Sequence, residues 1–194
     1  MARTKEFDPD AVLQSALELF WQRGYEATSM ADLVEHLGIG RASIYATFGN
    51  KHELYLKALD RYSEAHDPLL LCELSQPGPA LPGVRTVVLR FAAEAASRDG
   101  RQKGCFVTNT AAELGPHDAA AARRVESSWD HIETLLHSAL VRARAQGELP
   151  ADRDPRTLAR MLLVLMQGMR VVGKVSDDPG RVRDAAEQAL TLLA

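Results

Sequence analysis

Apolar residues recur every three to four positions along almost the whole chain, which is the repeat of an amphipathic α-helix. Asp8 and Pro9 are typical of a helix start, and Gly24 is typical of the end of that helix. The same pattern predicts further helices at about 28–37, 40–48, 51–72, 81–98, 104–114, 117–146, 155–174 and 179–193. No strand-like alternation occurs, so the sequence predicts an all-α fold.

The segment 75–83 is the clearest linker, because it holds three prolines and two glycines. Three short or medium helices and one long helix precede it, and a larger helical body follows. We therefore expect a three-helix domain over 1–50, a connecting long helix over 51–75 and a second helical domain over 76–194.

The segment 28–48 has the spacing of two short helices joined by a tight turn. Gly38 follows Val34 by four residues, at the point where a left-handed backbone conformation is needed. Ile44 is placed to pack the second helix onto the first. Six residues then point away from the core: Arg41, Ala42, Ser43, Tyr45, Ala46 and Thr47. The small ones among them permit entry into a DNA major groove, although two helices that merely pack together fit the same spacing.

Two stretches are more specific than this spacing: Phe20-Trp-Gln-Arg-Gly-Tyr-Glu-Ala-Thr-Ser-Met30 and Gly38-Ile-Gly-Arg-Ala-Ser-Ile-Tyr-Ala-Thr-Phe-Gly-Asn-Lys-His-Glu-Leu-Tyr55. Through them, residues 8–62 resemble the TetR family of one-component transcriptional regulators. The resemblance implies a helix-turn-helix DNA-binding domain, followed by a C-terminal helical domain for ligand binding and dimerisation. It also implies a homodimeric repressor that binds a palindromic operator on double-stranded DNA. A small-molecule or thiol-reactive effector would release that DNA.

The resemblance assigns DNA contacts to particular residues. Thr28 caps the helix over 28–37, and with Ser29 it would hold a phosphate through hydroxyl and backbone N–H groups. Tyr45 and Lys51 match family residues that reach the DNA backbone, and the Arg41 fork can read a guanine edge. The complete set of candidate DNA-binding residues is Thr28, Ser29, Arg41, Ala42, Ser43, Tyr45, Thr47 and Lys51. Arg3 and Lys5 form either an arm on DNA or a solvated terminus.

The charge balance qualifies this expectation, because DNA-binding domains are usually basic. The chain has a net charge of −3. Residues 1–62 hold seven Lys and Arg against nine Asp and Glu. We therefore expect few phosphate contacts and a modest dependence of DNA affinity on salt.

The segment Lys103–Leu114 resembles a Gly-Cys segment of a TetR branch that includes electrophile-sensing and copper-responsive repressors. Cys105 would be the first residue of a helix, where the helix dipole and the cations Arg101 and Lys103 favour a reactive thiolate. The alternative is a small apolar residue packed at a helix start. A metal- or redox-responsive regulator acting through Cys105 is the alternative function, although the six histidines show no metal-site spacing.

Candidate ligand-binding residues combine apolar walls with a few polar groups, and each fits an ordinary core equally well. They are Phe91, Cys105, Phe106, Asn109, Glu113, Trp129 and His131. The last two helices carry apolar stripes that the resemblance places in the dimer interface, against the alternative of burial within one subunit. That stripe comprises Leu158, Met161, Leu162, Leu165, Met169, Val182, Ala186, Ala189 and Leu190.

Several other classes find no support in the sequence. No apolar run is long enough to cross a membrane, and no signal peptide precedes the first helix. With two cysteines, Cys72 and Cys105, a reducing cytoplasmic location is expected. No nucleophile elbow, metal motif or phosphate loop is present, so we expect neither an enzyme nor a cofactor. A helical interaction module without operator specificity is the remaining alternative.

Overall fold

The computed structural model describes residues 7–193, without the side chain of Asp99. This part contains ten α-helices, one short 3-10 turn and no strand, so the all-α prediction is confirmed. The elements are α1 (Pro9–Arg23), α2 (Met30–Leu37), α3 (Arg41–Phe48), α4 (Lys51–Leu74), α5 (Leu81–Ala96), α6 (Arg98–Lys103), α7 (Phe106–Glu113), α8 (Ala119–Ala145), α9 (Pro155–Val175), α10 (Gly180–Leu190) and η1 (Thr191–Leu193). Arg3 and Lys5, proposed as an arm, lie outside the described residues.

The first four helices begin and end nearly where the sequence predicts. Asp8 caps α1 by accepting a hydrogen bond from the backbone N–H of Asp10 at 3.0 Å. Asn50 and Glu53 form a reciprocal capping box that starts α4. Local polar residues therefore set these boundaries.

Three later boundaries differ from the prediction. The helix expected over 81–98 ends at Ala96, because Ser97 is extended and accepts from the Gly100 N–H to start the separate helix α6. Cys105 is not the first residue of a helix, since it is extended and serves as the N-cap position of α7. The last predicted helix stops at Leu190 and continues as η1.

The helices enclose two apolar cores. One lies among α5, α8, α9, α10 and the end of α4. The other joins α1, α2, α3 and the first half of α4 to α7 and the start of α8. In this second core Phe106 of α7 packs edge-on against Tyr55 of α4, with ring centroids 5.1 Å apart. The three N-terminal helices, which we call the head, therefore share their core with α7 from the larger body.

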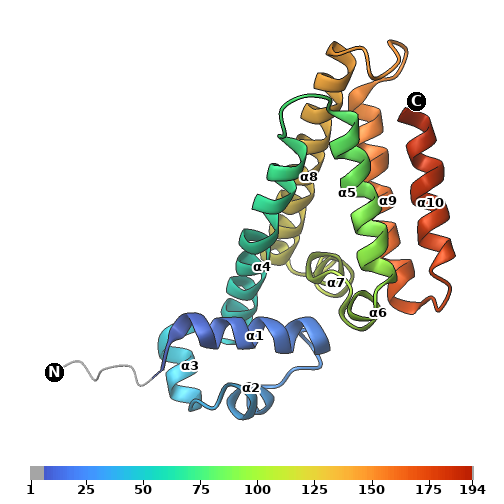
Figure 1. Cartoon of the computed structure of the whole chain (residues 1–194). Helices are drawn as coiled ribbons and strands as arrows, with labels where there is room; N and C mark the ends of the chain where they lie inside the picture. Colours follow the sequence, from blue (N-terminus) through green and yellow to red (C-terminus); the bar gives the residue numbers. More distant parts are fainter. Residues whose placement is uncertain (1–6, 194) are drawn as a thin grey trace.

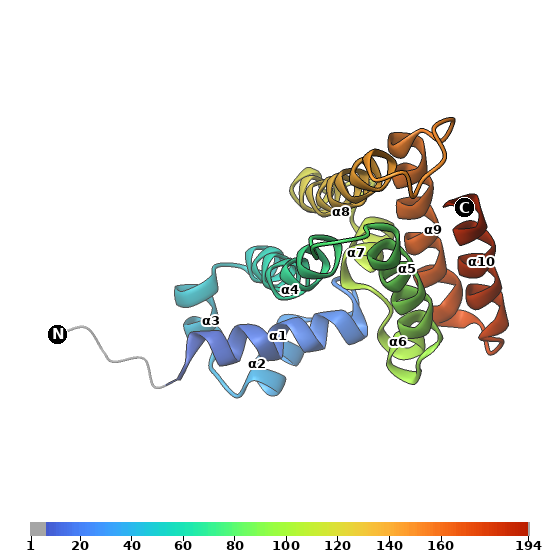
Figure 2. The ribbon, with the colours of Figure 1, turned by 45° about the horizontal axis from the view of Figure 1, so that its top comes forward.

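The long helix α4 is the backbone connection between the two cores. It starts beside α3 and runs to the bundle formed by α5, α8 and α9, while α10 lies at the far side of that bundle (Figures 1 and 2). The head is therefore joined to the bundle through both α4 and α7.

Candidate DNA-binding head and effector cavity

The turn between α2 and α3 has the predicted geometry. Gly38 adopts φ +65°, and its N–H donates to the Val34 carbonyl at 3.1 Å. Ile44 of α3 is fully buried in the core of the head. The two short helices are thus held together by the residues that the sequence pattern singles out.

The outward side of α3 is a shallow surface of small side chains. Arg41, Ala42, Tyr45 and Ala46 are exposed, and Tyr45 keeps 46% of its surface accessible. Ser43 and Thr47, two of the predicted contact residues, are half-buried. A flat helix surface that carries one arginine and one tyrosine can approach the floor of a major groove.

The roles predicted for Thr28 and Ser29 are wrong in part. Thr28 does not cap α2, because it is fully buried and its hydroxyl donates to the Gly24 carbonyl at 2.7 Å. Ser29 is the N-cap, and it forms a capping box with Asp32. The hydroxyl and the backbone N–H of Ser29 both bind the Asp32 carboxylate, so neither group is available to a phosphate in this conformation.

Lys51 also has an internal role that the sequence prediction lacked. Its ammonium donates to the carbonyls of Tyr25 and Thr28, at 2.9 Å each, and lies 3.9 Å from the centroid of the Tyr25 ring. Lys57 donates in the same way to the carbonyl of Phe48 at the end of α3. Both lysines thus stabilise the loops that carry α2 and α3, and at most one N–H of Lys51 stays available to DNA.

The remaining cations of the head and of the first half of α4 are also mostly engaged. Arg23 pairs with Asp32, and Arg61 binds Asp10 and Gln14. Among the lysines and arginines of residues 7–62, Arg41 alone has no hydrogen-bond or ion-pair partner in the structure. The head therefore presents one guanidinium without a partner, that of Arg41 at the start of α3.

The body contains a cavity of about 490 Å³ between α4, α5, α7, α8 and α9. Three of the predicted ligand-binding residues line it: Phe91, Cys105 and Trp129. Trp21 of α1 closes one side, and its indole N–H donates to the carbonyl of Gly104 at 3.1 Å. The head thus contributes directly to the wall of the cavity, which the sequence pattern did not predict.

Four predicted ligand-binding residues do not line this cavity. Phe106 is buried in the core of the head, and the Nε2 atom of His131 is buried without a partner among the described residues. Asn109 bridges the Lys103 carbonyl and the Lys174 ammonium. Glu113 binds the loop after α1. The amide of Asn109 and the carboxylate of Glu113 are therefore used for internal contacts.

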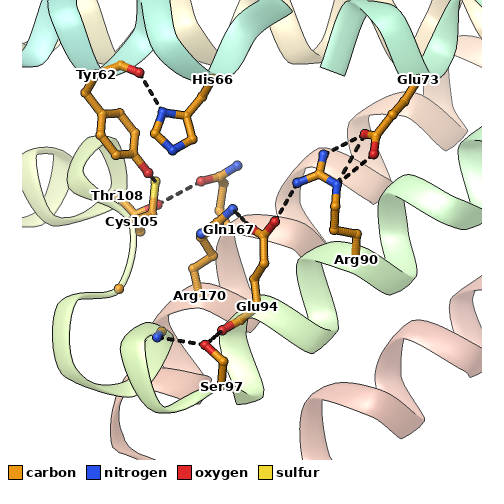
Figure 3. A network of polar contacts seen from close by, with 12 residues as sticks. Tyr62, His66, Glu73, Arg90, Glu94, Ser97, Cys105, Thr108, Gln167 and Arg170 are labelled. Atoms are coloured by element: carbon orange, nitrogen blue, oxygen red, sulfur yellow. Dashed lines mark hydrogen bonds and ion pairs between the residues drawn. The ribbon is translucent and has the colours of Figure 1, made fainter. Parts of the chain in front are cut away.

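Cys105 is buried and lies against the phenol of Tyr62, whose hydroxyl donates to the sulfur at 3.7 Å (Figure 3). Burial, together with the neighbouring Cys105, raises the pKa of Tyr62 well above its ordinary value. Tyr62 therefore stays a neutral hydrogen-bond donor at ordinary pH. Within residues 7–193, no group of three potential metal ligands is brought together.

A chain of charged side chains follows one wall of the cavity and was not predicted from the sequence (Figure 3). Arg90 of α5 binds Glu73 of α4 through two nitrogens and Glu94 through a third. Arg170 of α9 binds the other oxygen of Glu94 at 2.8 Å and lies over the ring of Phe91. Arg90 and Glu94 are an i, i+4 pair, but only the fold reveals that Glu73 and Arg170 join it.

Comparison with known proteins decides the family. The profile described as "Bacterial regulatory proteins, tetR family" matches residues 12–58, and the "Tetracyclin repressor-like, C-terminal domain" profile matches residues 80–190. This chain belongs to the TetR family. The uncharacterized HTH-type transcriptional regulator YezE of Bacillus subtilis is 37% identical to this TetR-family chain, over 100% of both chains.

Two further relatives of this TetR-family chain carry a more specific description. The HTH-type transcriptional repressor ComR of Escherichia coli is 36% identical, over 87% of this chain and 80% of ComR. The structure of a cysteine mutant of the TetR family transcriptional regulator CifR, complexed with a 26-bp operator duplex, is 30% identical. It superposes with a TM-score of 0.86 and 100% coverage of both chains.

The dimer interface predicted for this TetR-family chain needs correction. Six of its nine residues are buried within the subunit: Leu158, Leu162, Met169, Val182, Ala186 and Leu190. They pack α9 and α10 into the core with α5, and Met161, Leu165 and Ala189 lie partly buried against the same core. The apolar stripe of an amphipathic helix faces its own core, so these six buried residues pack within the subunit and do not reach a partner.

An apolar surface remains exposed on the other side of α9. Val164, Val171 and Val175 expose 70%, 56% and 85% of their surfaces, and they follow one another at helical spacing with Gly168 between them. A Cβ atom placed on Gly168 would meet nothing within 4 Å. Val141 on the neighbouring helix α8 is also exposed. Within residues 7–193, no helix has the length and apolarity needed to cross a membrane.

Proposed function

We propose that this protein is a homodimeric transcriptional repressor that binds a palindromic operator and releases it when a small molecule enters the cavity. The observation that carries the DNA-binding role is the exposed outer side of α3, with Arg41 and Tyr45 among small residues on a helix fixed by buried Ile44. The named role of ComR as a repressor and the operator DNA bound to the CifR mutant support the same function. We assign the protein to the cytoplasm, where an operator is accessible, and propose no catalytic activity.

The surface on α8 and α9 supports a dimer with a second copy of this chain. The exposed valines at 164, 171 and 175 are separated by seven and four residues, the repeat that places side chains along one helix seam. Gly168 permits close approach of a partner helix at the middle of the seam. We propose that α8 and α9 of two subunits form a four-helix bundle, whose twofold axis matches the symmetry of a palindromic operator.

The cavity is placed to couple an effector to the head. Trp21 belongs to α1 but lines the cavity, and Cys105, which follows Gly104, lines it as well. An occupant that shifts either residue therefore acts on α1 and α7 together. A ligand that binds better to the displaced arrangement would lower the affinity for DNA by population shift.

The test is selection of binding sites from a random DNA duplex library, followed by footprinting of the enriched sequence. We expect two symmetric half-sites separated by about one helical turn. Arg41→Ala should weaken protection strongly, whereas the control Arg85→Ala, an exposed arginine of α5, should not. Failure to enrich any sequence would instead support an interaction module without operator specificity.

A further inference from the structure

We infer that the cavity selects an uncharged, flat aromatic molecule that carries an oxygen acceptor, and that it rejects the carboxylate of the same shape. This inference rests on the proposed function, because it treats the cavity as the effector site. It adds the chemical class of the effector.

Aromatic side chains give the cavity its apolar character. Tyr62 and His66 are stacked with ring centroids 4.1 Å apart, and Trp21 meets Tyr62 edge-on at 5.0 Å. Phe91 and Trp129 also line the cavity. Rings in such arrangements favour a flat apolar guest, because it can stack on one ring and meet the edges of others.

The arginines of the cavity are already neutralised by protein carboxylates (Figure 3). Glu94 accepts from Arg90 at 2.6 Å through one oxygen and from Arg170 at 2.8 Å through the other. Glu73 occupies the second side of the Arg90 fork. A ligand carboxylate near Arg170 would therefore meet the Glu94 carboxylate as well, and it would lose its hydration beside a guanidinium whose charge Glu94 already offsets. The Nε atom of Arg170 has no partner among the described residues, but it is buried.

The wall of the cavity carries one further cation and one further acid. Lys103 lies 5.4 Å from the centroid of the Trp21 ring, and Asp67 is an acid on the same cavity wall. Burial raises the pKa of Asp67 above its ordinary value.

A neutral polar anchor is available on α9. The Gln167 side-chain oxygen accepts from the Thr108 hydroxyl at 2.8 Å, while its amide N–H2 group has no hydrogen-bond partner among the described residues. This group lines the cavity and can donate to a ketone, aldehyde or similar oxygen. The donor fixes the orientation of a guest whose ring system the aromatic walls hold.

Three naphthalenes of similar shape test the inference on the dimer without DNA: 2-acetylnaphthalene, 2-naphthoate and 2-naphthylmethylammonium. Trp21 and Trp129 are the two tryptophans of the chain and both line the cavity, so quenching of their fluorescence reports binding. We expect the ketone to bind at least about tenfold more tightly than either ion, a difference of about 1.4 kcal/mol. Equal or tighter binding of an ion, or no saturable quenching by the ketone, would overturn the inference.

Glu94→Gln tests the cause of this selectivity. It removes the carboxylate between Arg90 and Arg170, so affinity for 2-naphthoate should rise at least about fivefold while affinity for the ketone changes little. Glu133→Gln, which alters the exposed pair with Arg160 on the outer surface, is the matched control and should leave the ratio unchanged. If folded Glu94→Gln keeps the parent protein's ratio of ketone affinity to 2-naphthoate affinity, the charge argument is contradicted. If that variant does not fold, the comparison of the three ligands on the unaltered protein still decides the inference. Because no DNA is present, this outcome is independent of operator binding.

Discussion

The Glu113 carboxylate is bound to the backbone of Tyr25: it accepts the N–H of Tyr25 at 3.0 Å through one oxygen and the N–H of Glu26 at 2.8 Å through the other. The last residue of α7 thereby fixes the loop that leads from α1 to α2. Gly24 makes room for this contact, because a Cβ atom there would lie 2.9 Å from the Glu113 carboxylate, and its φ of +88° suits glycine. The body and the head are joined by these hydrogen bonds as well as by α4.

We predict that Glu113→Ala lowers the free energy of unfolding by about 1–3 kcal/mol, because it leaves two backbone donors unsatisfied. Glu113→Gln should be less destabilising, since its amide oxygen still accepts one of them. Urea denaturation measures both variants. Equal stability of Glu113→Ala and the parent protein would show that the contact is not formed in solution.

Lys51→Met should lower the free energy of unfolding by about 1–2 kcal/mol, because the Lys51 ammonium donates hydrogen bonds to the carbonyls of Tyr25 and Thr28. Its DNA affinity should decrease without a change in salt dependence. Arg41→Ala should instead reduce the slope of log affinity against log salt by about one for each phosphate that Arg41 neutralises. Fluorescence anisotropy with the selected operator at several salt concentrations separates the two roles. If Lys51→Met has a much smaller slope of log affinity against log salt than the parent protein, Lys51 contacts a phosphate, as the sequence predicts.

Val164→Glu and Val171→Glu should convert the dimer into a monomer, because each places a charge on the exposed seam of α9. Light scattering at micromolar concentration measures the mass. Leu89→Glu is the control, since Leu89 is an exposed apolar residue on another helix, α5. Leu162→Ala should lower stability by about 2–5 kcal/mol through a cavity in the subunit core, with the dimer mass retained. If both glutamate variants remain dimers, this seam of α9 is not the dimer interface.

Asp118→Asn should make stability less sensitive to acid. The backbone N–H of Ala121 and the neighbouring His52 lower the pKa of Asp118 below its ordinary value. A lowered pKa in the folded state contributes stability above about pH 4, and the contribution disappears as pH falls through the folded value. The variant should therefore be less stable than the parent protein by about 0.5–1 kcal/mol at pH 7, and this difference should disappear at acid pH below the folded-state pKa. Denaturation at these pH values measures the difference, with Asp130→Asn on the exposed side of α8 as control.

Cys105→Ser tests the thiol-sensing alternative. If Cys105 senses electrophiles, a quinone or aldehyde should release operator DNA from the parent protein and not from Cys105→Ser. The position favours access from the cavity, while the Tyr62 hydrogen bond and burial of the sulfur oppose fast reaction. Cys72→Ser, at the exposed cysteine, is the matched control. Release that persists in Cys105→Ser would remove the sensor role.

The sequence by itself determined the helices and the turn of the DNA-binding head. Periodic apolar residues, the cap residue Asp8 and Gly38 act within a few positions of the chain, so their effect is visible in the sequence. The family-specific motifs around Tyr45 added the expected function.

Only the tertiary structure decided which polar groups are free and which apolar residues face outward. Lys51 and Glu113 bind backbone groups 23 or more positions away in the chain, which no local pattern reveals. The apolar stripe of α9 was visible, but whether its residues face their own core or a partner depends on the helices packed beside it. The cavity has the same origin, because its wall brings Trp21, Glu94 and Arg170 together from three distant helices.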